Sequence, residues 1–428
     1  MNPRVRYPSL PLLRFLSLMA MHIILAGQYR LAAWIQPAWL AYAFLGLALA
    51  LCSAHWGLSC ADDRGSHGPG GLLGGGGGAG GRRGVLAAGA AMAVFMGAGL
   101  AARWLWIRRL PIDPHLGDML PQIQQAIRDL LSGEFPYRVH HFPWPIHLPY
   151  PPALWEAYLP AEMAGLDLRY TTLACLAVLG AVWFLQFKTL AVRRGAGVRL
   201  WAWVALAGAF FLSPLVLRFV IHGHTAPYWL VLAVLPLMLH VRRPGLAAVL
   251  LGVACAMRQP AILLAPILWW HWMRTQSWKK ATALAGLAAA TSFLIYWPFV
   301  ARDAVAVWWT PMRQYATVGR ETFAFNPSMI LETIGFSNLF YLAGWDRFLS
   351  PAAVAAFAAI FALNARRMDT AADATRAMAL ASLGFALLAP IPFYYEYFPA
   401  LVLFMQAWWM EAASPAVPKP ASLFGRTP

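Results

Sequence analysis

The most informative part of this sequence is residues 111–170, which read PIDPHLGDMLPQIQQAIRDLLSGEFPYRVHHFPWPIHLPYPPALWEAYLPAEMAGLDLRY. It is the longest polar interruption in a chain of 428 residues that is 60% hydrophobic and only 12% charged. It contains 7 of the 17 acidic residues and 4 of the 11 histidines. Because soluble domains carry about 25% charged residues, the composition predicts an all-α polytopic membrane protein with this stretch as its main loop.

The basic residues predict which loops lie on which side of the membrane. Short connections rich in Lys and Arg stay in the cytoplasm, and Arg pairs bound several apolar segments, among them Arg82–Arg83, Arg193–Arg194, Arg242–Arg243 and Arg366–Arg367. This pattern accounts for the net charge of +16 without a nucleic-acid partner. We expect about twelve transmembrane or re-entrant helices, both chain ends inside, and residues 111–170 outside. Most acidic residues then fall on the outer side, which indicates that the chemistry is there.

The segments divide the chain into five parts. Residues 1–60 are expected to form a two-helix appendage and 61–84 a flexible, glycine-rich cytoplasmic linker. Residues 85–300 form the membrane core with the outer loop 111–170, residues 301–347 a second outer loop, and residues 348–428 the C-terminal helices and cytoplasmic tail. Within the core, residues 245–257 and 260–272 are each shorter than the roughly 20 residues of a full span. They predict a helical hairpin whose tip reaches toward the outer side.

Asp118 is the candidate general base. Apolar residues recur at helical spacing over residues 119–132, with Gln and Arg between them, which predicts an amphipathic helix in the membrane interface. Gly133 is a suitable terminator. Asp118 stands at the start of this helix, where a carboxylate can serve as a simple N-cap or can accept a proton during a reaction. The two roles are compatible.

The rest of the loop alternates prolines with aromatic residues. Prolines disfavour a helix and favour an extended chain, and Tyr137, Trp144 and Tyr150 are candidates for stacking on sugar rings. The alternative is a belt of aromatic residues at the membrane surface. The histidines of this loop show no metal-ligand spacing. A divalent cation such as Mg²⁺ or Mn²⁺, held by carboxylates such as Asp118, stays open because hard cations prefer oxygen ligands.

Arg258, His222 and His224 are the candidate residues outside this loop. A charge between two apolar runs is expensive in a membrane and points to function, and the guanidinium fork of Arg258 matches a phosphate. The alternative is an arginine that extends to a lipid headgroup. His222 and His224 flank a glycine at the outer end of a span, where they can bind a phosphate or hydroxyl or lie as ordinary interfacial residues.

Several motifs together resemble bacterial GT-C glycosyltransferases, in particular the mannosyl- and arabinofuranosyltransferase-like membrane proteins. They are GDMLPQIQQAIRDLLSGEFPY, HLPYPPALW and GLDLRY in the outer loop, HGHTAPYWLVL, and the hairpin GLAAVLLGVACAMRQPAILLAPIL. The resemblance covers roughly residues 85–300. It departs from the family pattern in two respects: residues 1–84 are additional, and Asp118 stands alone instead of in an acidic pair.

The resemblance implies a multi-pass enzyme of the bacterial plasma membrane. The donor would be a sugar on a polyprenyl phosphate, transferred with inversion to a lipid, glycan or protein acceptor on the extracytoplasmic face. Asp118 takes the acidic position of the family and Arg258 its basic hairpin position, and Arg169 in GLDLRY joins the substrate-binding candidates. The alternatives are a transporter or lipid flippase, for which matching charged repeats are expected, and a non-catalytic scaffold.

Overall fold

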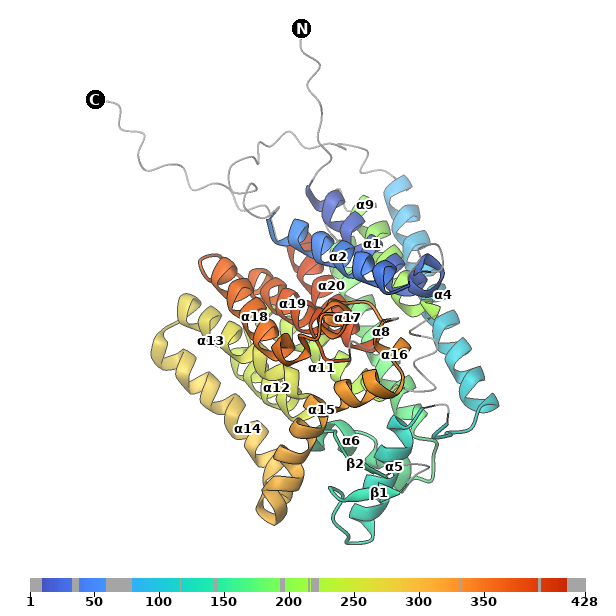
Figure 1. Ribbon diagram of the computed structural model, residues 1–428. Coiled ribbons are helices and arrows are strands. Elements are labelled where there is room, and N and C mark those ends of the chain that lie inside the picture. The colour runs from blue at the N-terminus through green and yellow to red at the C-terminus, as the bar shows by residue number, and fades with distance from the viewer. Residues whose placement is uncertain are drawn as a thin grey trace, which may run out of the picture.

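The computed structural model describes residues 10–32, 38–58, 79–115, 117–141, 145–192, 197–214, 216, 223–331, 333–391 and 394–413. These residues form helices, apart from one short antiparallel hairpin of two strands. The all-α class expected from the composition is therefore confirmed (Figure 1).

Four helical stretches within the described part of the chain are long and apolar enough to cross a membrane. They lie at Arg83–Arg109, Arg169–Ala191, Trp278–Trp309 and Asp346–Ala365. They correspond to α4 (Ala79–Arg109), α8 (Arg169–Ala191), α14 (Trp278–Ala304) with the π-helix η2 (Val305–Trp309), and α18 (Leu349–Ala365) with η3 (Asp346–Phe348). Several shorter apolar helices accompany them, so the structure supports a multi-pass protein but not the count of about twelve spans.

The N-terminal helices differ from the expected appendage. The two helices of this part are α1 (Leu10–Ala32) and α2 (Ala38–Leu58). The pair packs on the C-terminal part of the chain: α1 contacts α9 and α20, and α2 contacts α19. Helix α4 also begins earlier than expected, at Ala79, so the end of the 61–84 linker is helical. Residues 59–78 of that region lie outside the described residues.

Large aromatic side chains form the centre of the bundle. The helices around them are α8, α9 (Gly197–Phe211), α11 (Ala226–His240), α19 (Ala371–Leu387) and α20 (Phe398–Ala413). Trp183 packs edge-on against Trp203, with ring centroids 5.9 Å apart, and Trp203 stacks on Trp408. Buried aromatic residues of this size contribute much of the apolar area that a fold removes from its surroundings.

The predicted hairpin at residues 245–272 is confirmed. It consists of α12 (Pro244–Met257), the 3₁₀ turn η1 (Gln259–Leu263) and α13 (Leu264–Thr275). Both arms pack on α14. At Gly252 a Cβ atom would meet the carbonyl oxygen of Ala288 and lie 2.6 Å from Cβ of Thr291, so only glycine allows α12 to approach α14 this closely.

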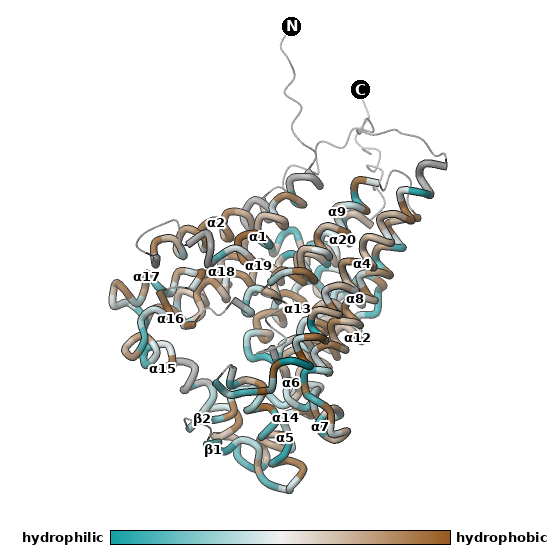
Figure 2. Tube along the Cα trace, turned by 90° about the vertical axis from the view of Figure 1, so that its right-hand side faces the viewer, coloured by the Kyte–Doolittle hydropathy of each residue, from teal (hydrophilic) through white to brown (hydrophobic). Residues whose placement is uncertain are grey.

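A polar layer covers the end of the bundle that carries the hairpin tip. It contains α5 (Met119–Leu131), the strands β1 (Val139–His141) and β2 (Pro145–His147), α6 (Pro152–Glu156) and α7 (Leu159–Met163). Figure 2 shows hydrophilic residues gathered over these elements, below a mainly hydrophobic bundle. The amphipathic helix and the extended chain after it are confirmed. The helical turns α6 and α7 were not foreseen; Pro152 lies in the first turn of α6, a place where proline is tolerated.

The second outer loop is largely helical, contrary to expectation. Residues 301–347 contain η2, α15 (Thr310–Phe325), α16 (Ser328–Leu331) and α17 (Ser337–Leu342). Helix α15 mixes polar and apolar residues, which made it resemble a loop when judged by hydropathy alone. The backbone of Asp303 is non-helical, so the helix is kinked there. The Asp303 carboxylate accepts a hydrogen bond from the amide of Ala306 at 2.9 Å, at the start of the helical segment that follows.

Residues expected on the cytoplasmic side meet one another in space. Arg274 pairs with Asp369 across the α13 and α18 ends, and Arg376 pairs with Glu411 at 2.7 Å. Arg199 donates to the carbonyl oxygen of Ala412 at 3.1 Å. These contacts lie between segments that the distribution of basic residues assigned to one side of the membrane.

Candidate functional site

Helix α5 positions Asp118 without using its carboxylate as a cap. The Asp118 carbonyl oxygen accepts the amide of Gln122 at 3.0 Å, but its side chain makes no capping hydrogen bond. At the other end, Gly133 adopts a φ of 81° and terminates the helix as expected. Burial raises the pKa of the half-buried Asp118 carboxyl above the usual 3.8, although hydrogen bonds from its own backbone and from Gln122 act in the opposite direction. A carboxylate with this environment is a stronger base than an exposed aspartate.

The outer loop is fastened to the tip of the hairpin. Gln259, directly after Arg258, donates its side-chain amide to the carbonyl oxygen of Pro149 at 3.0 Å. The Tyr137 hydroxyl donates to the carbonyl oxygen of Tyr150 at 2.9 Å and accepts from Nε1 of Trp155 at 3.2 Å. These bonds hold the backbone around Tyr150 against the hairpin.

His224 lies between two tyrosine rings. Its ring centroid is 4.5 Å from that of Tyr150 and 5.7 Å from that of Tyr395. The residue before it, Gly223, accepts a hydrogen bond from the Thr172 hydroxyl at 3.1 Å, which fixes the turn that carries the imidazole. The histidine thus joins the loop to the C-terminal segment around Tyr395.

Arg258 has a carboxylate partner that the sequence did not reveal. Its guanidinium forms a short ion pair with Glu396 in the 3₁₀ turn η4 (Tyr394–Tyr397), and it lies 5.9 Å from the centroid of the Tyr395 ring. Both side chains of the ion pair are largely buried. Because Glu396 is 138 positions away in the chain, no local pattern predicts the pairing.

Electrostatics link these residues into one cluster around Tyr150. Burial raises the pKa of the Tyr150 hydroxyl well above 10, Asp118 and Glu396 raise it further, and Arg258 opposes them. Because electrostatic interactions weaken with distance, charges that shift the pKa of Tyr150 lie near its hydroxyl. We therefore define the candidate site as Asp118, Tyr150, His224, Arg258 and Glu396.

Two other predicted site residues that the structure describes, Tyr137 and Arg169, have other roles. Tyr137 is buried against Trp155 and Phe299, and its hydroxyl is used in the loop, so it positions Tyr150 in this structure. Arg169 is buried too; its Nε donates to Asp167 at 2.9 Å and its Nη2 to the carbonyl oxygen of Ile107 at 3.0 Å, which ties the start of α8 to the end of α4.

Trp144 and His222 lie outside the described residues. Their predicted contacts with substrate stay predictions.

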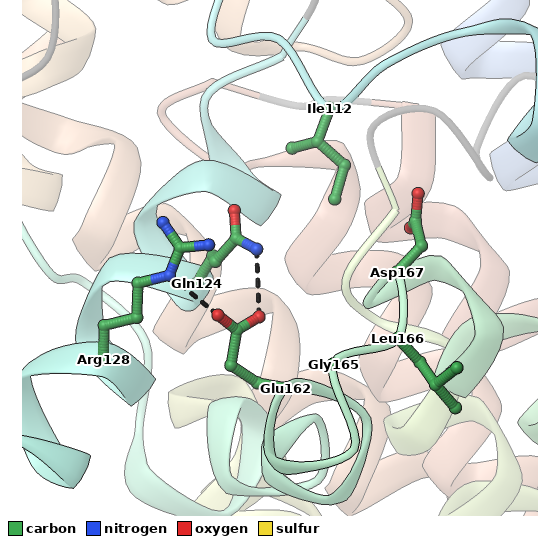
Figure 3. A pocket seen from close by; sticks show the side chains of 7 residues that line it. All are labelled: Ile112, Gln124, Arg128, Glu162, Gly165, Leu166 and Asp167. Atoms are coloured by element: carbon green, nitrogen blue, oxygen red, sulfur yellow. Dashed lines mark hydrogen bonds and ion pairs between the residues drawn. The ribbon is translucent and has the colours of Figure 1, made fainter.

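A separate polar pocket of about 320 Å³ opens between α5, α7 and the start of α8 (Figure 3). Glu162 accepts hydrogen bonds from Gln124 at 2.9 Å and from Arg128 at 2.7 Å. The remaining lining residues are Ile112, Gly165, Leu166 and Asp167. No residue of the candidate site lines this pocket. The hydrogen bonds of Glu162 join α5 to α7.

One histidine of the loop, His140, makes structural contacts. His140 is buried, with Nε2 3.0 Å from the carbonyl oxygen of Pro136 and Nδ1 3.5 Å from Asp129. Among the residues the structure describes, no three His, Cys, Asp or Glu side chains are grouped to hold a metal ion.

The chain matches no protein-family model, and no curated protein or solved structure is similar to it at a significant level.

Proposed function

We propose that this protein is an inverting glycosyltransferase that uses a polyprenyl-phosphate-linked sugar on the extracytoplasmic face of a membrane. The proposal rests on two observations: the hairpin tip that carries Arg258 is hydrogen-bonded to the loop beside Tyr150, and the charges of Asp118 and Arg258 both act on the hydroxyl of Tyr150. One is a base with a raised pKa, and the other is a cation suited to phosphate. Transfer from a phosphate donor needs both groups in one site.

Each residue has a defined task in this proposal. Asp118 accepts the proton of the acceptor hydroxyl as its oxygen attacks the anomeric carbon. The bond between that carbon and the phosphate oxygen breaks, and its electron pair leaves with the phosphate. Arg258 stabilises the departing phosphate, and His224, beside Tyr150, is the second candidate to contact it. The acceptor is a hydroxyl of a lipid, glycan or protein.

The lipid tail of the donor requires an apolar surface next to this site. Helix α14 offers one, because Phe293, Leu294 and Trp297 are all more than half exposed. In a membrane protein such a surface faces lipid or an isoprenoid chain. Both arms of the hairpin that carries Arg258, α12 and α13, pack on this same helix α14.

The test is sugar transfer from a polyprenyl-phosphate donor by the purified protein and its Asp118→Asn variant. The variant keeps the shape but cannot accept a proton, so we expect transfer to fall by at least about 100-fold, in line with the contribution of a general base. The matched control is Asp113→Asn, because Asp113 only accepts the amide of His115 at 2.8 Å in a turn of the same segment.

Thermal melting of both variants should match the wild type. Near-wild-type transfer by Asp118→Asn rejects the base assignment. EDTA is expected to reduce the rate only in part; a complete loss reversed by Mg²⁺ would instead show that a carboxylate-bound cation is essential.

A further inference from the structure

The pocket between α5, α7 and the start of α8 has the size and the polar groups of a binding site. Its volume of about 320 Å³ lies at the lower end of the range for ligand pockets, about 300–1,000 Å³. Gln124 and Arg128 on α5 and Glu162 on α7 line it with polar groups (Figure 3). Ile112 and Leu166 add apolar surface. The pocket lies in the polar layer, at the end of the bundle that carries the candidate site.

The polar groups of this pocket keep unused capacity for hydrogen bonds. The carboxylate of Glu162 accepts one bond on each oxygen, from Gln124 and from Arg128, whereas an ionised carboxylate has about four acceptor sites. Arg128 uses its Nε in this contact, and its two Nη groups have no partner among the described residues. The amide oxygen of Gln124 points away from Glu162, toward Ile112. The pocket therefore presents donors and acceptors together.

The charges around the pocket are paired. Arg128 forms an ion pair with Glu162, and Asp167 forms one with Arg169. The described lining residues thus leave no unpaired charge, which favours an uncharged polar ligand over a phosphate or a metal cation. A hydroxyl group both donates and accepts a hydrogen bond. A ring of hydroxyls with C–H groups between them matches this mixture of donors, acceptors and apolar edges, and that is the chemistry of a sugar.

Helix α5 connects this pocket to the proposed general base. Asp118 stands directly before the helix, and Gln124 and Arg128 are six and ten residues farther along the chain. At 1.5 Å per residue they lie about 9 and 15 Å from Asp118 along the helix axis. A single sugar ring does not span the longer distance, whereas an oligosaccharide does.

From this arrangement, which rests on the proposed function, we propose that the acceptor is an oligosaccharide whose units remote from the reacting hydroxyl bind in this pocket. Arg128 donates to their oxygen atoms through its Nη groups, and Glu162 accepts from their hydroxyls. The reacting hydroxyl, at one end of the chain, then lies at Asp118. The acceptor is thereby narrowed from a lipid, glycan or protein to a glycan of several units.

The first test is binding of the full-length protein, in nanodiscs, to an array of linear oligosaccharides. The array runs from single sugars to hexasaccharides and is built from common hexoses, pentoses and N-acetylhexosamines. We expect binding to chains of several units and much weaker binding of the single sugars, because only a chain occupies both the pocket and the cleft near Asp118.

Two variants remove the pocket in different ways. Arg128→Ala deletes a donor, and Leu166→Trp fills the space while keeping the polar groups. Both side chains are more than half exposed, so the fold should be retained, which thermal melting checks. We expect Arg128→Ala to weaken binding at least about tenfold, the usual effect of losing a hydrogen bond to a charged group, and Leu166→Trp to weaken it clearly. The matched control is Arg347→Ala, at an exposed arginine of residues 301–347, and should bind as the wild type.

The second test uses the tightest-binding oligosaccharide as acceptor, with a polyprenyl-phosphate-linked sugar as donor. Arg128→Ala should raise the KM for this acceptor at least about tenfold with little change in kcat, because the pocket is remote from the reacting atoms. With the same acceptor shortened to the disaccharide at its reactive end, wild type and variant should have the same KM. A structural defect at Asp118 would instead lower kcat for both acceptors.

The outcomes separate this inference from the proposed function. A folded wild type that binds no oligosaccharide, or an unchanged KM for the long acceptor in both variants, overturns the inference and leaves the glycosyltransferase standing. Glycan binding that depends on Arg128, without any transfer from the donor, rejects the proposed function. Binding to phosphatidylglycerol vesicles that is lost in Arg128→Ala, in place of glycan binding, would assign the pocket to a lipid headgroup and overturn the inference. If one variant does not fold, the other decides.

Discussion

At the scale of single residues, the site contains two carboxylates that differ in their partners. Asp118 makes no ion pair with any described residue, and its burial favours the protonated form. Glu396 is bound to Arg258. Under the proposed function, the first carboxylate accepts a proton from the acceptor hydroxyl, whereas the second holds the guanidinium of Arg258 in place.

The raised pKa of Asp118 predicts how transfer depends on pH. The base must be deprotonated to act, so activity is lost as pH falls through the pKa of Asp118, and that pKa lies above the usual 3.8. We expect the acidic limb of kcat/KM for the acceptor to be shifted upward accordingly. Rates should be measured at donor concentrations that saturate at every pH, so that effects on donor binding do not contribute. An acidic limb at or below pH 3.8 contradicts the assignment.

Arg258→Ala should impair use of the donor much more than use of the acceptor. Removing the guanidinium deletes the contact to phosphate and leaves Glu396 buried without its cation, a change that typically costs about 2–5 kcal/mol. We expect the KM for the donor to rise by about 100-fold while the KM for the acceptor changes little. Arg258→Lys, which keeps the charge but loses the fork, serves as the intermediate variant. Equal effects on both substrates would argue for a general structural defect.

Sequence reasoning identified Asp118 and Arg258 because each is a charged residue in an informative local setting. Asp118 begins an amphipathic helix, and Arg258 interrupts an apolar run. Glu396 carries no comparable signal: it stands among tyrosines at the end of a span, and its partner is far away in the chain. Tyr137 was identified as an aromatic residue suited to stacking and Arg169 as part of a motif that resembles a known family, but only the folded structure shows that their polar groups bind other parts of the protein.

At the scale of elements, the strand hairpin is held to α5 by one buried carboxylate. Asp129 on α5 accepts two hydrogen bonds from Arg138, at 2.7 and 3.0 Å, and one from Gln125 at 2.9 Å. Its side chain is 3% exposed, whereas that of Glu134, which also pairs with Arg138, is 59% exposed. The stability of the loop should depend on the first pair and not on the second.

We therefore expect Asp129→Ala to destabilise the outer loop clearly, because the buried Asp129 carboxylate accepts hydrogen bonds from both Arg138 and Gln125. Glu134→Ala should have little effect, because both side chains of its ion pair with Arg138 are exposed. Limited proteolysis of the loop, followed over denaturant concentration, measures both. Similar protection of the two variants would show that burial does not distinguish the pairs.

The elements that were predicted correctly share a strong periodic pattern or a sharp boundary. Helix α5 has both an amphipathic repeat and Gly133 at its end, and the α12–α13 hairpin is divided by Arg258-Gln259-Pro260. Helix α15 was missed because its mixed composition has low mean hydropathy although its residues support a helix.

At the scale of the whole molecule, the structure separates two ends. The candidate site, the outer loop and the hairpin tip gather at one end, and the contacts of Arg199, Arg274 and Arg376 gather segments expected in the cytoplasm. The two groupings agree with the side of the membrane predicted from basic residues. The agreement was not built into the prediction, which used no contact information.

Thiol labelling in intact cells tests this polarity. In a cysteine-free background, a cysteine at exposed Glu134 should react with a membrane-impermeant maleimide, and a cysteine at exposed Lys279 should react only after the membrane is permeabilised. The expected contrast is at least about tenfold in labelling rate, because a lipid bilayer excludes the charged reagent. Labelling of both positions in intact cells would reject the proposed orientation.

The short hairpin described above has a further consequence for the surrounding lipid. Helix α12 has 14 residues and is therefore about 21 Å long, against a hydrocarbon thickness of about 30 Å. In a membrane, an arginine and a glutamate at its tip require the outer leaflet to thin or bend inward until headgroups and water reach them. Under the proposed function, bilayer thickness would then affect access of the donor to the site: thicker membranes resist this deformation, and thinner ones hold lipid phosphates nearer to the depth of Arg258.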